Sequence, residues 1–406
     1  MKVAVIGGGI QGCGVAMELA GRGADVVLFE RRPRILDGAS RHTEGKIHLG
    51  FVYAADDSLR TARLMARGAA TFAPALERWL GTAAEGLATS TPFHYVVHRE
   101  SMRSPAALEA GYREIAAIVR EAIPEGAYFG AADPGHVRRL EAGELAPFGP
   151  DAAAVFETSE LAVEPEALAD ALAATVAGHE AITVATGSRV VGVDRHGRRL
   201  HVADDEGTAT SARFDAIVNC AWEGRLALDA TAGLRPPASW CFRMKYFGRA
   251  DLPPGHEPLP SSTVVLGPFG DVVDFGDGRT FLSWYPAGRR GWSDASQPPD
   301  WPSSLSGDEA RGLMDAMADG LGGVVPAAAR VLRERPESVR IRGGVIYALG
   351  DTDVCDPGSE LHERHRVGPT AHGAYQSVDT GKYALAPLFA ARVAERMQRG
   401  SGVPVA

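Results

Sequence analysis

The sequence is poor in cysteine and has no long hydrophobic run. Its four cysteines, Cys13, Cys220, Cys241 and Cys355, are widely spaced and form no CxxC pair, so we expect neither a zinc site nor a disulfide framework, and no metal. No apolar stretch approaches the roughly 18 residues that a membrane span requires. The first apolar strand already begins at Lys2, which leaves no room for a secretion signal and predicts a cytoplasmic protein.

Positive charge is also scarce. The chain has 42 Lys and Arg against 51 Asp and Glu, which gives a net charge of -9. This balance argues against non-specific binding to nucleic acid or to an anionic membrane, so we expect a small-molecule partner, no nucleic acid and no membrane span. Apolar residues make up 45% and charged residues 23% of the 406 residues, as in globular proteins with about two or three domains and an interior pocket.

The first thirty residues carry the clearest motif. An apolar strand from Lys2 to Ile6 leads into Gly7-Gly8-Gly9-Ile10-Gln11-Gly12, and a second apolar run from Ala24 to Phe29 ends at Glu30. A buried strand, a glycine turn, a helix and a second strand closed by a carboxylate form the dinucleotide fingerprint. Its glycines permit the sharp turn, the approach of a pyrophosphate and close helix packing, and Glu30 lies near the usual distance of about 20 residues for the acid that binds ribose hydroxyls.

The end of the chain favours FAD over NAD as the dinucleotide. Residues 345–349 predict a short strand that returns to the first domain and ends in Gly350-Asp351, and residues 373–382 form a polar, glycine-punctuated approach to a late helix. The start of such a helix places N–H groups beside the region of a flavin where negative charge collects on reduction. The alternative is a capped C-terminal helix that only packs.

The middle of the chain predicts a discontinuous nucleotide domain and a second domain. Helical spacing over 165–176 and strands at 182–184, 188–193, 200–202 and 214–221 belong to the first. Aromatic strand-like runs over 240–336 predict an antiparallel sheet, covered by helices at 105–121 and at 306–321, where Ser306 and Glu309 have capping-box spacing. The fold class is therefore α/β with an α+β second domain: a Rossmann-like, discontinuous FAD-binding domain of residues 1–85, 150–235 and 337–406, and an antiparallel-sheet substrate domain of residues 86–149 and 236–336.

These segments support a family resemblance. Residues 7–30, the strands at 188–193 and 215–221 and the C-terminal helix together resemble the flavoprotein superfamily of D-amino-acid, glycine and sarcosine oxidases. Within it, the run from Arg41 to Tyr53 looks like the segment of L-2-hydroxyglutarate oxidases that passes beside the flavin, although Glu44 stands where that subgroup has a serine. The residues expected to hold FAD are Gly7, Gly9, Ile10, Gln11, Gly12, Glu30, Arg31, Ser40, Arg41, Val190, Cys220, Ala221, Gly350, Asp351, Val378, Thr380, Gly381 and Lys382.

The catalytic candidates follow from what a flavin does. Flavin N5 accepts a hydride from a carbon that bears nitrogen or oxygen. A hydroxy acid needs a histidine base near its hydroxyl, whereas an unprotonated amine does not, and His42 and His48 are the candidates because they lie in the flavin-side segment. Lys46, between them, would place positive charge near N5. For each of these residues a structural or solvated role is the alternative.

The C-terminal region is rich in arginine and histidine, which suggests an anionic substrate because a guanidinium binds a carboxylate through two hydrogen bonds. The resemblance places a substrate arginine at Arg342, and Arg364 is the second candidate; a solvated loop is the alternative.

The sequence thus predicts an FAD-dependent oxidoreductase that transfers a hydride from a CH–NH bond of a small, carboxylate-bearing amino acid or amine, with O2 or another electron acceptor reoxidising the flavin. The alternatives are an FAD-dependent 2-hydroxy acid oxidase or dehydrogenase, and a non-catalytic flavin-binding protein.

Overall fold

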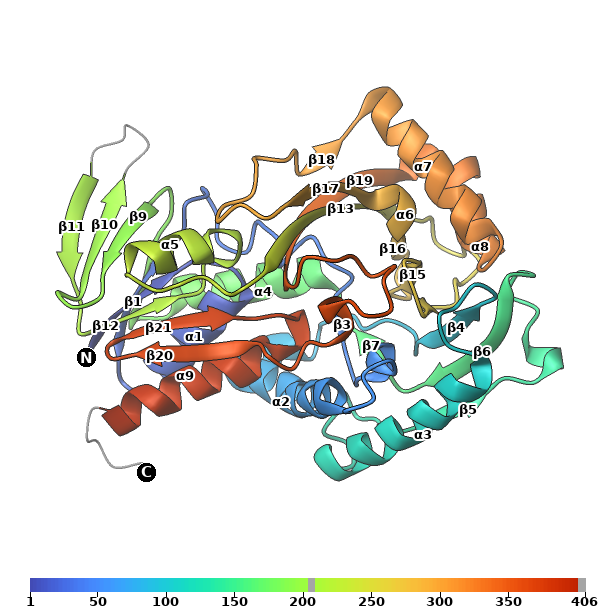
Figure 1. The fold of residues 1–406 in the computed structure, drawn as a ribbon, viewed down its shortest axis with the longest axis horizontal. Coiled ribbons are helices and arrows are strands. Elements are labelled where there is room, and N and C mark those ends of the chain that lie inside the picture. The colour runs from blue at the N-terminus through green and yellow to red at the C-terminus, as the bar shows by residue number, and fades with distance from the viewer. Residues whose placement is uncertain (204–208, 401–406) are drawn as a thin grey trace.

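The computed structural model describes residues 1–203 and 209–400 (Figure 1). Residues 204–208 and 401–406, which the predicted FAD-binding domain includes, lie outside the described residues. The chain forms two large sheets, one six-stranded and one ten-stranded, together with smaller sheets of three and two strands. None of the described helices combines the length and apolar character needed to cross a lipid bilayer.

The six-stranded sheet has the order β20-β21-β12-β1-β2-β8. All neighbouring pairs are parallel except β20 and β21. Its strands are buried on both faces, as in other parallel sheets, because Val3 and Val5 of β1 enter one core and Ala4 and Ile6 enter another. The strands are β1 (Lys2–Ile6), β2 (Asp25–Phe29), β8 (Ile182–Ala185), β12 (Ala216–Asn219), β20 (Gly368–His372) and β21 (Tyr375–Asp379).

Helices cover one face of this sheet and a small sheet covers the other (Figure 1). The first face packs on α1 (Ile10–Ala20), α2 (Arg60–Leu80), α4 (Pro165–Gly178) and α9 (Ala386–Gly400). The opposite face packs on α5 (Arg225–Thr231) and on the three-stranded sheet of β9 (Arg189–Asp194), β10 (Arg199–Ala203) and β11 (Ala209–Arg213).

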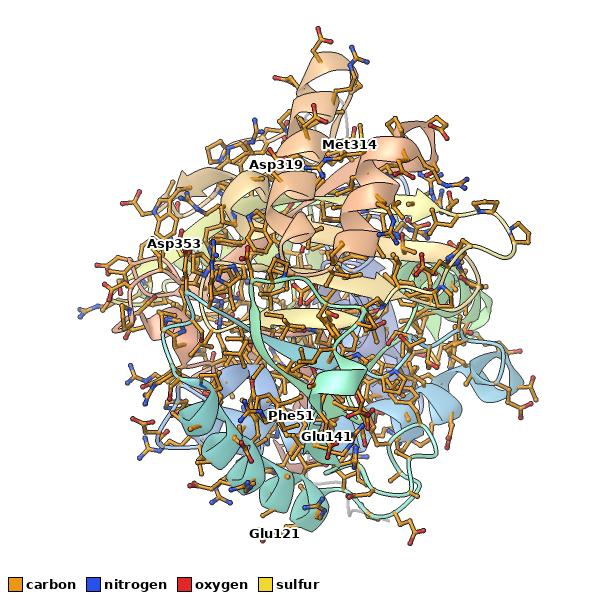
Figure 2. All side chains as sticks on the ribbon, turned by 90° about the vertical axis from the view of Figure 1, so that its right-hand side faces the viewer. Phe51, Glu121, Glu141, Met314, Asp319 and Asp353 are labelled. Carbon is orange, nitrogen blue, oxygen red and sulfur yellow. The ribbon has the colours of Figure 1, made fainter. Side chains whose placement is uncertain are left out.

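The ten-stranded sheet has the order β18-β19-β13-β16-β15-β14-β4-β6-β5, with β17 also paired to β13. Figure 2 shows the hairpin of α7 (Gly307–Gly322) and α8 (Pro326–Glu334), marked by Met314 and Asp319, over one face, and α3 (Pro105–Ala122), marked by Glu121, at the other end. The strands are β4 (His94–His98), β5 (Val137–Arg139), β6 (Ala152–Thr158), β13 (Trp240–Asp251), β14 (Ser262–Val265), β15 (Gly270–Asp274), β16 (Arg279–Trp284), β17 (Arg289–Ser293), β18 (Ser304–Leu305) and β19 (Val339–Leu349).

The remaining elements are short. They are β3 (Lys46–Ile47) and β7 (Leu161–Ala162), which pair antiparallel, the single-turn α6 (Tyr285–Gly288), and the 3-10 helices η1 (Phe51–Tyr53), η2 (Gly81–Ala84), η3 (Ala142–Glu144), η4 (Trp222–Gly224), η5 (Pro336–Ser338), η6 (Glu360–His362) and η7 (Tyr383–Leu385).

The predicted fold class is confirmed, and two expectations about its parts are wrong. The strand expected at 345–349 is longer, as β19, and pairs along its length with β13, so it lies in the ten-stranded sheet and the chain returns to the first sheet only at β20. An apolar run predicts that a strand is buried, but it does not predict which sheet the strand joins. The capping box is absent because the side chain of Ser306 accepts no hydrogen bond at the start of α7.

The structure also divides the segments of the expected domains differently. Residues 152–158, expected in the FAD-binding domain, form β6 of the ten-stranded sheet, and β9, β10 and β11, also expected in that domain, form a sheet of their own. The domain boundaries stay a prediction.

The contact of α9 with the first core can be tested at Phe389, which is fully buried there. Replacing Phe389 by Ala should lower the free energy of unfolding by about 3–5 kcal/mol, measured by urea denaturation of the FAD-loaded protein. The exposed Glu395 on the same helix gives the control, since Glu395→Ala should change the free energy by less than about 0.5 kcal/mol. Equal effects of the two substitutions would contradict the packing of α9 in this core.

Candidate functional site

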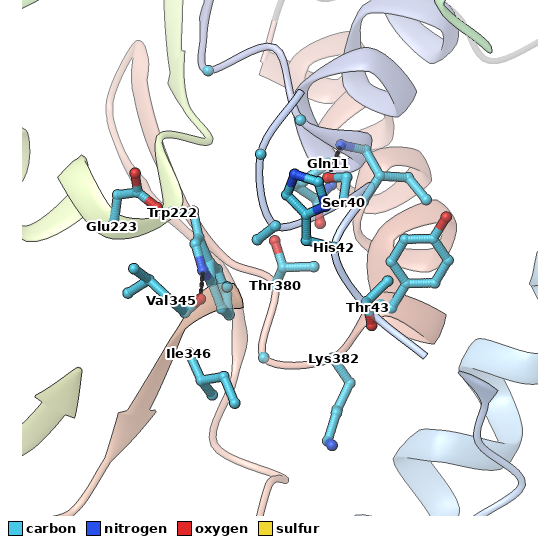
Figure 3. A pocket seen from close by; sticks show the side chains of 18 of the residues that line it. Gln11, Ser40, His42, Thr43, Trp222, Glu223, Val345, Ile346, Thr380 and Lys382 are labelled. Atoms are coloured by element: carbon cyan, nitrogen blue, oxygen red, sulfur yellow. Dashed lines mark hydrogen bonds between the residues drawn. The ribbon is translucent and has the colours of Figure 1, made fainter. Parts of the chain in front are cut away.

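A cavity of about 700 Å³ is lined by the carboxyl ends of β1, β2 and β12, by the loop after β21, and by strands of the ten-stranded sheet (Figure 3). In an open α/β sheet this edge is where ligands bind. Residues from both sheets therefore form the walls of the same cavity.

At one end of the cavity the backbone turns too tightly to accept side chains. Gly7 has a φ of 98°, and a Cβ there would lie 2.7 Å from the carbonyl oxygen of Cys220. A Cβ on Gly12 would lie only 1.8 Å from the carbonyl oxygen of Gly7. The start of α1 can approach the turn after β1 only because both positions are glycine.

The start of α1 is arranged to receive an anion. Gly9 occupies the N-cap position without any side chain, and the first turn contains no acidic residue. Ser40 accepts a hydrogen bond of 2.9 Å from the backbone N–H of Ile10, and the side chain of Gln11 donates to Ala386. The N-cap residue itself provides no cap, and a helix start of this kind binds phosphate through its remaining backbone N–H groups and the helix dipole.

The carboxylate of Glu30 closes this end of the cavity. It accepts hydrogen bonds of 2.8 Å from the backbone N–H groups of Gly8 and Arg32. Arg31 forms an ion pair with Glu223, which lies in the loop after β12. The glycine cradle, the uncapped helix and this carboxylate fit the pyrophosphate and ribose of a dinucleotide.

The loop after β12 is tied to the ten-stranded sheet. The indole of Trp222 donates a hydrogen bond of 2.8 Å to the carbonyl oxygen of Val345 in β19 (Figure 3). His42 also lines the cavity, as do Ser40 and Thr380, which are labelled with it in Figure 3. Burial and the charge of Arg342 lower the pKa of His42 to about 4, so this imidazole is neutral at pH 7.

Further along the cavity, two lysines lie within 4.0 Å of the same carboxylate, that of Asp271. Lys46 is 2% exposed, donates to Thr263, and lies 2.9 Å from Asp271 Oδ1, while Lys245 Nζ lies 3.8 Å from Oδ2 of the same carboxylate. Burial lowers the pKa of Lys46, but Asp271, Glu160 and Glu44 more than offset this, so the net shift is upward and Lys46 stays charged. Burial raises the pKa of Asp271, but its two lysines outweigh that effect and hold the pKa well below its usual range.

His48 lies in the wall between two carboxylates. Its Nδ1 is 3.5 Å from Glu160 Oε1 and its Nε2 is 4.0 Å from Glu44 Oε1. Burial and the nearby charge of Lys382 lower the pKa of His48, although Glu160 opposes them, so the ring is neutral at pH 7. Glu160 is itself fixed by hydrogen bonds from Tyr95 (2.6 Å) and from the backbone N–H of Leu49 (2.7 Å).

Arg364 is a buried cation that lines the cavity. It is 7% exposed, and within the described part of the chain no carboxylate oxygen lies within 4.0 Å of its guanidinium. It donates a 3.4 Å hydrogen bond to the carbonyl oxygen of Tyr347, but its Nε has no partner among the described residues. Burial lowers the pKa of Arg364, and the neighbouring Arg243 adds to this effect.

The profile of the family described as "FAD dependent oxidoreductase" matches residues 2–351. The chain belongs to this FAD dependent oxidoreductase family. It is an enzyme of that class and its cofactor is FAD. The cradle at β1 and α1 fits this cofactor on the geometry described above.

Solved structures share the fold of this family member along its whole length. Iminodiacetate oxidase from Chelativorans sp. BNC1 is 19% identical, with a TM-score of 0.65 over 99% of this chain and 96% of that chain. Glycine oxidase from Geobacillus kaustophilus is 16% identical, with a TM-score of 0.63 over 100% and 95%.

A curated relative is closer in sequence but longer. The tRNA 5-methylaminomethyl-2-thiouridine biosynthesis bifunctional protein MnmC of Burkholderia multivorans is 30% identical over 288 residues, which are 69% of this chain and 38% of the relative. The aligned part is thus well under half of that relative.

Most residues that the sequence singled out line the cavity. These are Gly7, Gly9, Ile10, Gln11, Glu30, Arg31, Ser40, His42, Lys46, His48, Val190, Cys220, Ala221, Arg364, Thr380, Gly381 and Lys382. Their individual roles stay predictions.

Six expected site residues do not line the cavity. Gly12 packs against the turn behind it, Arg41 pairs with Asp170, and Arg342 lies opposite Phe247 on β19, beyond the part of that strand that reaches the cavity. The other three are Gly350, Asp351 and Val378. The family resemblance located the strand of Arg342 but did not determine where that strand meets the cavity.

The sequence did not single out several lining residues, chiefly Lys245, Asp271, Thr263 and Tyr285. One signal was present: Arg243 and Lys245 interrupt an otherwise apolar aromatic run, Cys241 to Phe247, and a charge in a buried strand usually has a partner.

The glycine cradle can be tested at Gly12. Gly12→Ala should weaken FAD binding by roughly 5- to 150-fold, because overpacking of about 1–3 kcal/mol must be relieved by opening the turn. Titration of the FAD-free protein with FAD, followed by flavin fluorescence, measures the effect.

Gly312 provides the matched control, because it is also helical and a Cβ there meets nothing within 4 Å. Gly312→Ala should leave FAD binding unchanged and raise the free energy of unfolding by up to about 1 kcal/mol. Unaltered FAD affinity in Gly12→Ala would contradict the role of this close approach.

Proposed function

We propose that this enzyme oxidises the CH–NH bond of a small amino acid or amine that carries a carboxylate. The observation that carries the proposal is Arg364, a buried guanidinium in the cavity wall that has no carboxylate within 4.0 Å in the described part of the chain. An unpaired buried cation is costly, so a ligand that supplies the missing carboxylate is favoured strongly.

Two acidic groups, one that acts on Arg364 and one that pairs with its neighbour Arg243, are already engaged. Asp379 is paired with Arg225 at 3.4 Å, and Asp353 lies between Arg243 (3.5 Å) and Arg289 (2.8 Å). A substrate carboxylate is therefore the anion that would complete the environment of Arg364.

FAD, when bound, supplies the acceptor for the hydride that leaves the substrate carbon. Gly7, Gly9 and Glu30 would hold its pyrophosphate and ribose, and Thr380 to Lys382 would lie against its ring. The aromatic wall of Phe247, Phe269 and Phe281 would exclude water and hold the C–H bond in one orientation.

The proton of a substrate ammonium must leave before the bond is oxidised. The neutral ring of His48, supported by Glu160 on its Nδ1 side, would accept a hydrogen bond or a proton at Nε2. O2 is proposed as the terminal electron acceptor, and another oxidant would serve the same step.

Oxidation of a 2-hydroxy acid is the second candidate, and His48 is the observation that favours it. A hydroxyl proton is far less acidic than that of an ammonium and requires a positioned base. The same Arg364 would hold the carboxylate of either substrate.

The neighbours named above act on iminodiacetate and glycine according to their names, whereas the longer relative is named for tRNA biosynthesis. A free small molecule is proposed here because the net charge of -9 disfavours binding to a nucleic acid.

The direct test is an anaerobic screen of flavin absorbance against amino acids, N-alkyl amino acids, simple amines and 2-hydroxy acids. Bleaching by carboxylate-bearing amines is the expected result. A flavin that none of these compounds reduces would overturn the proposal.

Arg364→Met tests the carboxylate site. The Kd for carboxylate substrates, obtained from the saturation of the reduction rate, should rise by roughly 30- to 5000-fold, because removing one partner of a buried charge pair costs about 2–5 kcal/mol. The exposed Arg366 is the matched control, and Arg366→Met should leave the Kd unchanged. A similar Kd in both variants would mean that Arg364 does not bind the carboxylate.

His48→Gln distinguishes the two substrate classes. Reduction by a hydroxy acid should slow by about 10²- to 10⁴-fold, the usual contribution of a general base, whereas reduction by an amine should recover at high pH, where the amine loses its proton in solution. In the unaltered enzyme, a rate that depends on His48 should fall only below pH 6.5, because a lowered pKa keeps the ring unprotonated until that range. Rates that do not change in the variant would exclude His48 as the base.

A further inference from the structure

The inner part of the cavity carries more positive than negative charge. Among the described residues that line it there, four are cations and two are carboxylates: Lys46, Lys245, Lys382 and Arg364 against Glu44 and Asp271. The excess is two positive charges, in a chain whose net charge is -9. At the cofactor end the lining charges balance, with Arg31, Arg32 and Arg189 against Glu30, Asp37 and Glu223.

The first excess charge is that of Arg364, which the proposed function assigns to a substrate carboxylate. The second cationic group is that of Lys46 and Lys245, which share Asp271. Glu160 and Glu44 also act on Lys46, whereas Lys245 has no carboxylate oxygen closer than 3.8 Å among the described residues. In a cavity walled by Phe247, Phe269 and Phe281, a ligand anion beside Lys245 is therefore favourable.

Of these two lysines, Lys245 is the one whose ammonium group remains available to bind a ligand. Lys46 donates to both Thr263 and Asp271, and its Nζ lies 4.3 Å from the ring centroid of Phe93. Lys245 Nζ, in contrast, is 3.8 Å from Asp271 and donates no hydrogen bond to any described residue. Its side chain is 16% exposed and lines the cavity.

Lys245 and Arg364 are linked through the same wall. Arg243 and Lys245 are two residues apart on β13, so their side chains point to the same face of the sheet. Lys245 Nζ lies 5.9 Å from the ring centroid of Tyr285. The hydroxyl of Tyr285 accepts a 2.8 Å hydrogen bond from Arg243, which in turn is close enough to Arg364 to act on its charge. Two separated cationic groups thus face one substrate space.

We propose that the substrate is a diacid, with one carboxylate bound by Arg364 and a second acidic group bound by Lys245. This inference rests on the proposed function and narrows it from a carboxylate-bearing amine to a compound with two acidic groups. Lys245 is then the residue that selects the diacid over its monoacid analogues.

The experiment compares pairs of compounds in which one carboxylate is replaced by a carboxamide, such as aspartate with asparagine, glutamate with glutamine, and N-carboxymethyl amino acids with their amides. Each is tested in both configurations with the FAD-loaded enzyme under anaerobic conditions, and Kd is taken from the saturation of flavin reduction. The unaltered enzyme should bind the diacid at least about tenfold more tightly than its amide, the effect of one hydrogen-bonded charge pair.

Lys245→Met should abolish this preference, and Lys245→Arg, which keeps the charge, should restore most of it. Arg311→Met, which removes an exposed charge on α7, should retain the full preference. The visible spectrum of the bound flavin reports that each variant is folded and loaded.

Three results would overturn the diacid inference: no preference in the unaltered enzyme, a preference that persists in Lys245→Met, or a change of flavin potential in Lys245→Met without a change of preference, which would assign the charge to the cofactor. If monoacid amines reduce the flavin as well as diacids do, the proposed function stands and only this inference fails. If no compound of either kind reduces it, both fail.

Discussion

The organisation of the cavity depends on how buried charge is neutralised. Asp271 keeps Lys46 charged in a place where an isolated ammonium would lose its proton, because its carboxylate lies 2.9 Å away and Glu160 and Glu44 add to its effect. The same carboxylate leaves Lys245 only partly balanced at 3.8 Å. The carboxylate of Asp271 on β15 is thus shared between Lys46 on β3 and Lys245 on β13, and the proposed ligand anion would complete the balance of charge in this wall.

The two sheets contribute different things to the site. The six-stranded sheet supplies mainly backbone, since its glycine turn, its uncapped helix and the loop after β21 present N–H groups rather than side chains. The ten-stranded sheet supplies the charged side chains of Lys245 and Asp271 and the aromatic side chains of Phe247 and Phe281. The hydrogen bond from Trp222 to Val345 joins the two, so the loop at the cofactor end and the strand at the substrate end are held in one frame. A displacement of the loop after β12 would therefore also displace β19 through this hydrogen bond.

The parts of the site that the sequence predicts are those whose signals are local. The fingerprint lies within thirty residues, so its strand, turn, helix and carboxylate could be recognised together. The group of Lys46, Lys245 and Asp271 draws on three distant segments, and no spacing rule brings them together before the strands pair. Strand pairing is a second feature that the sequence does not predict. The apolar run at Val345 indicates a buried strand, but it does not indicate that this strand pairs with β13.

Arg364 rather than Arg342 reaches the cavity for a reason that lies in β19 itself. A Cβ at Gly343 would come within 2.4 Å of Met244, and one at Gly344 within 3.1 Å of the carbonyl oxygen of His42. The segment that carries His42 therefore packs directly on the backbone of β19, and the residues of this strand that line the cavity, Gly344, Val345 and Ile346, carry no charge. An arginine that binds the proposed substrate carboxylate would therefore have to come from another segment, and Arg364, between β19 and β20, is the arginine that lines this part of the cavity. Because that segment is anchored by the backbone N–H of Arg364 on Thr61, at 2.9 Å, the guanidinium is held by the fold before any substrate arrives.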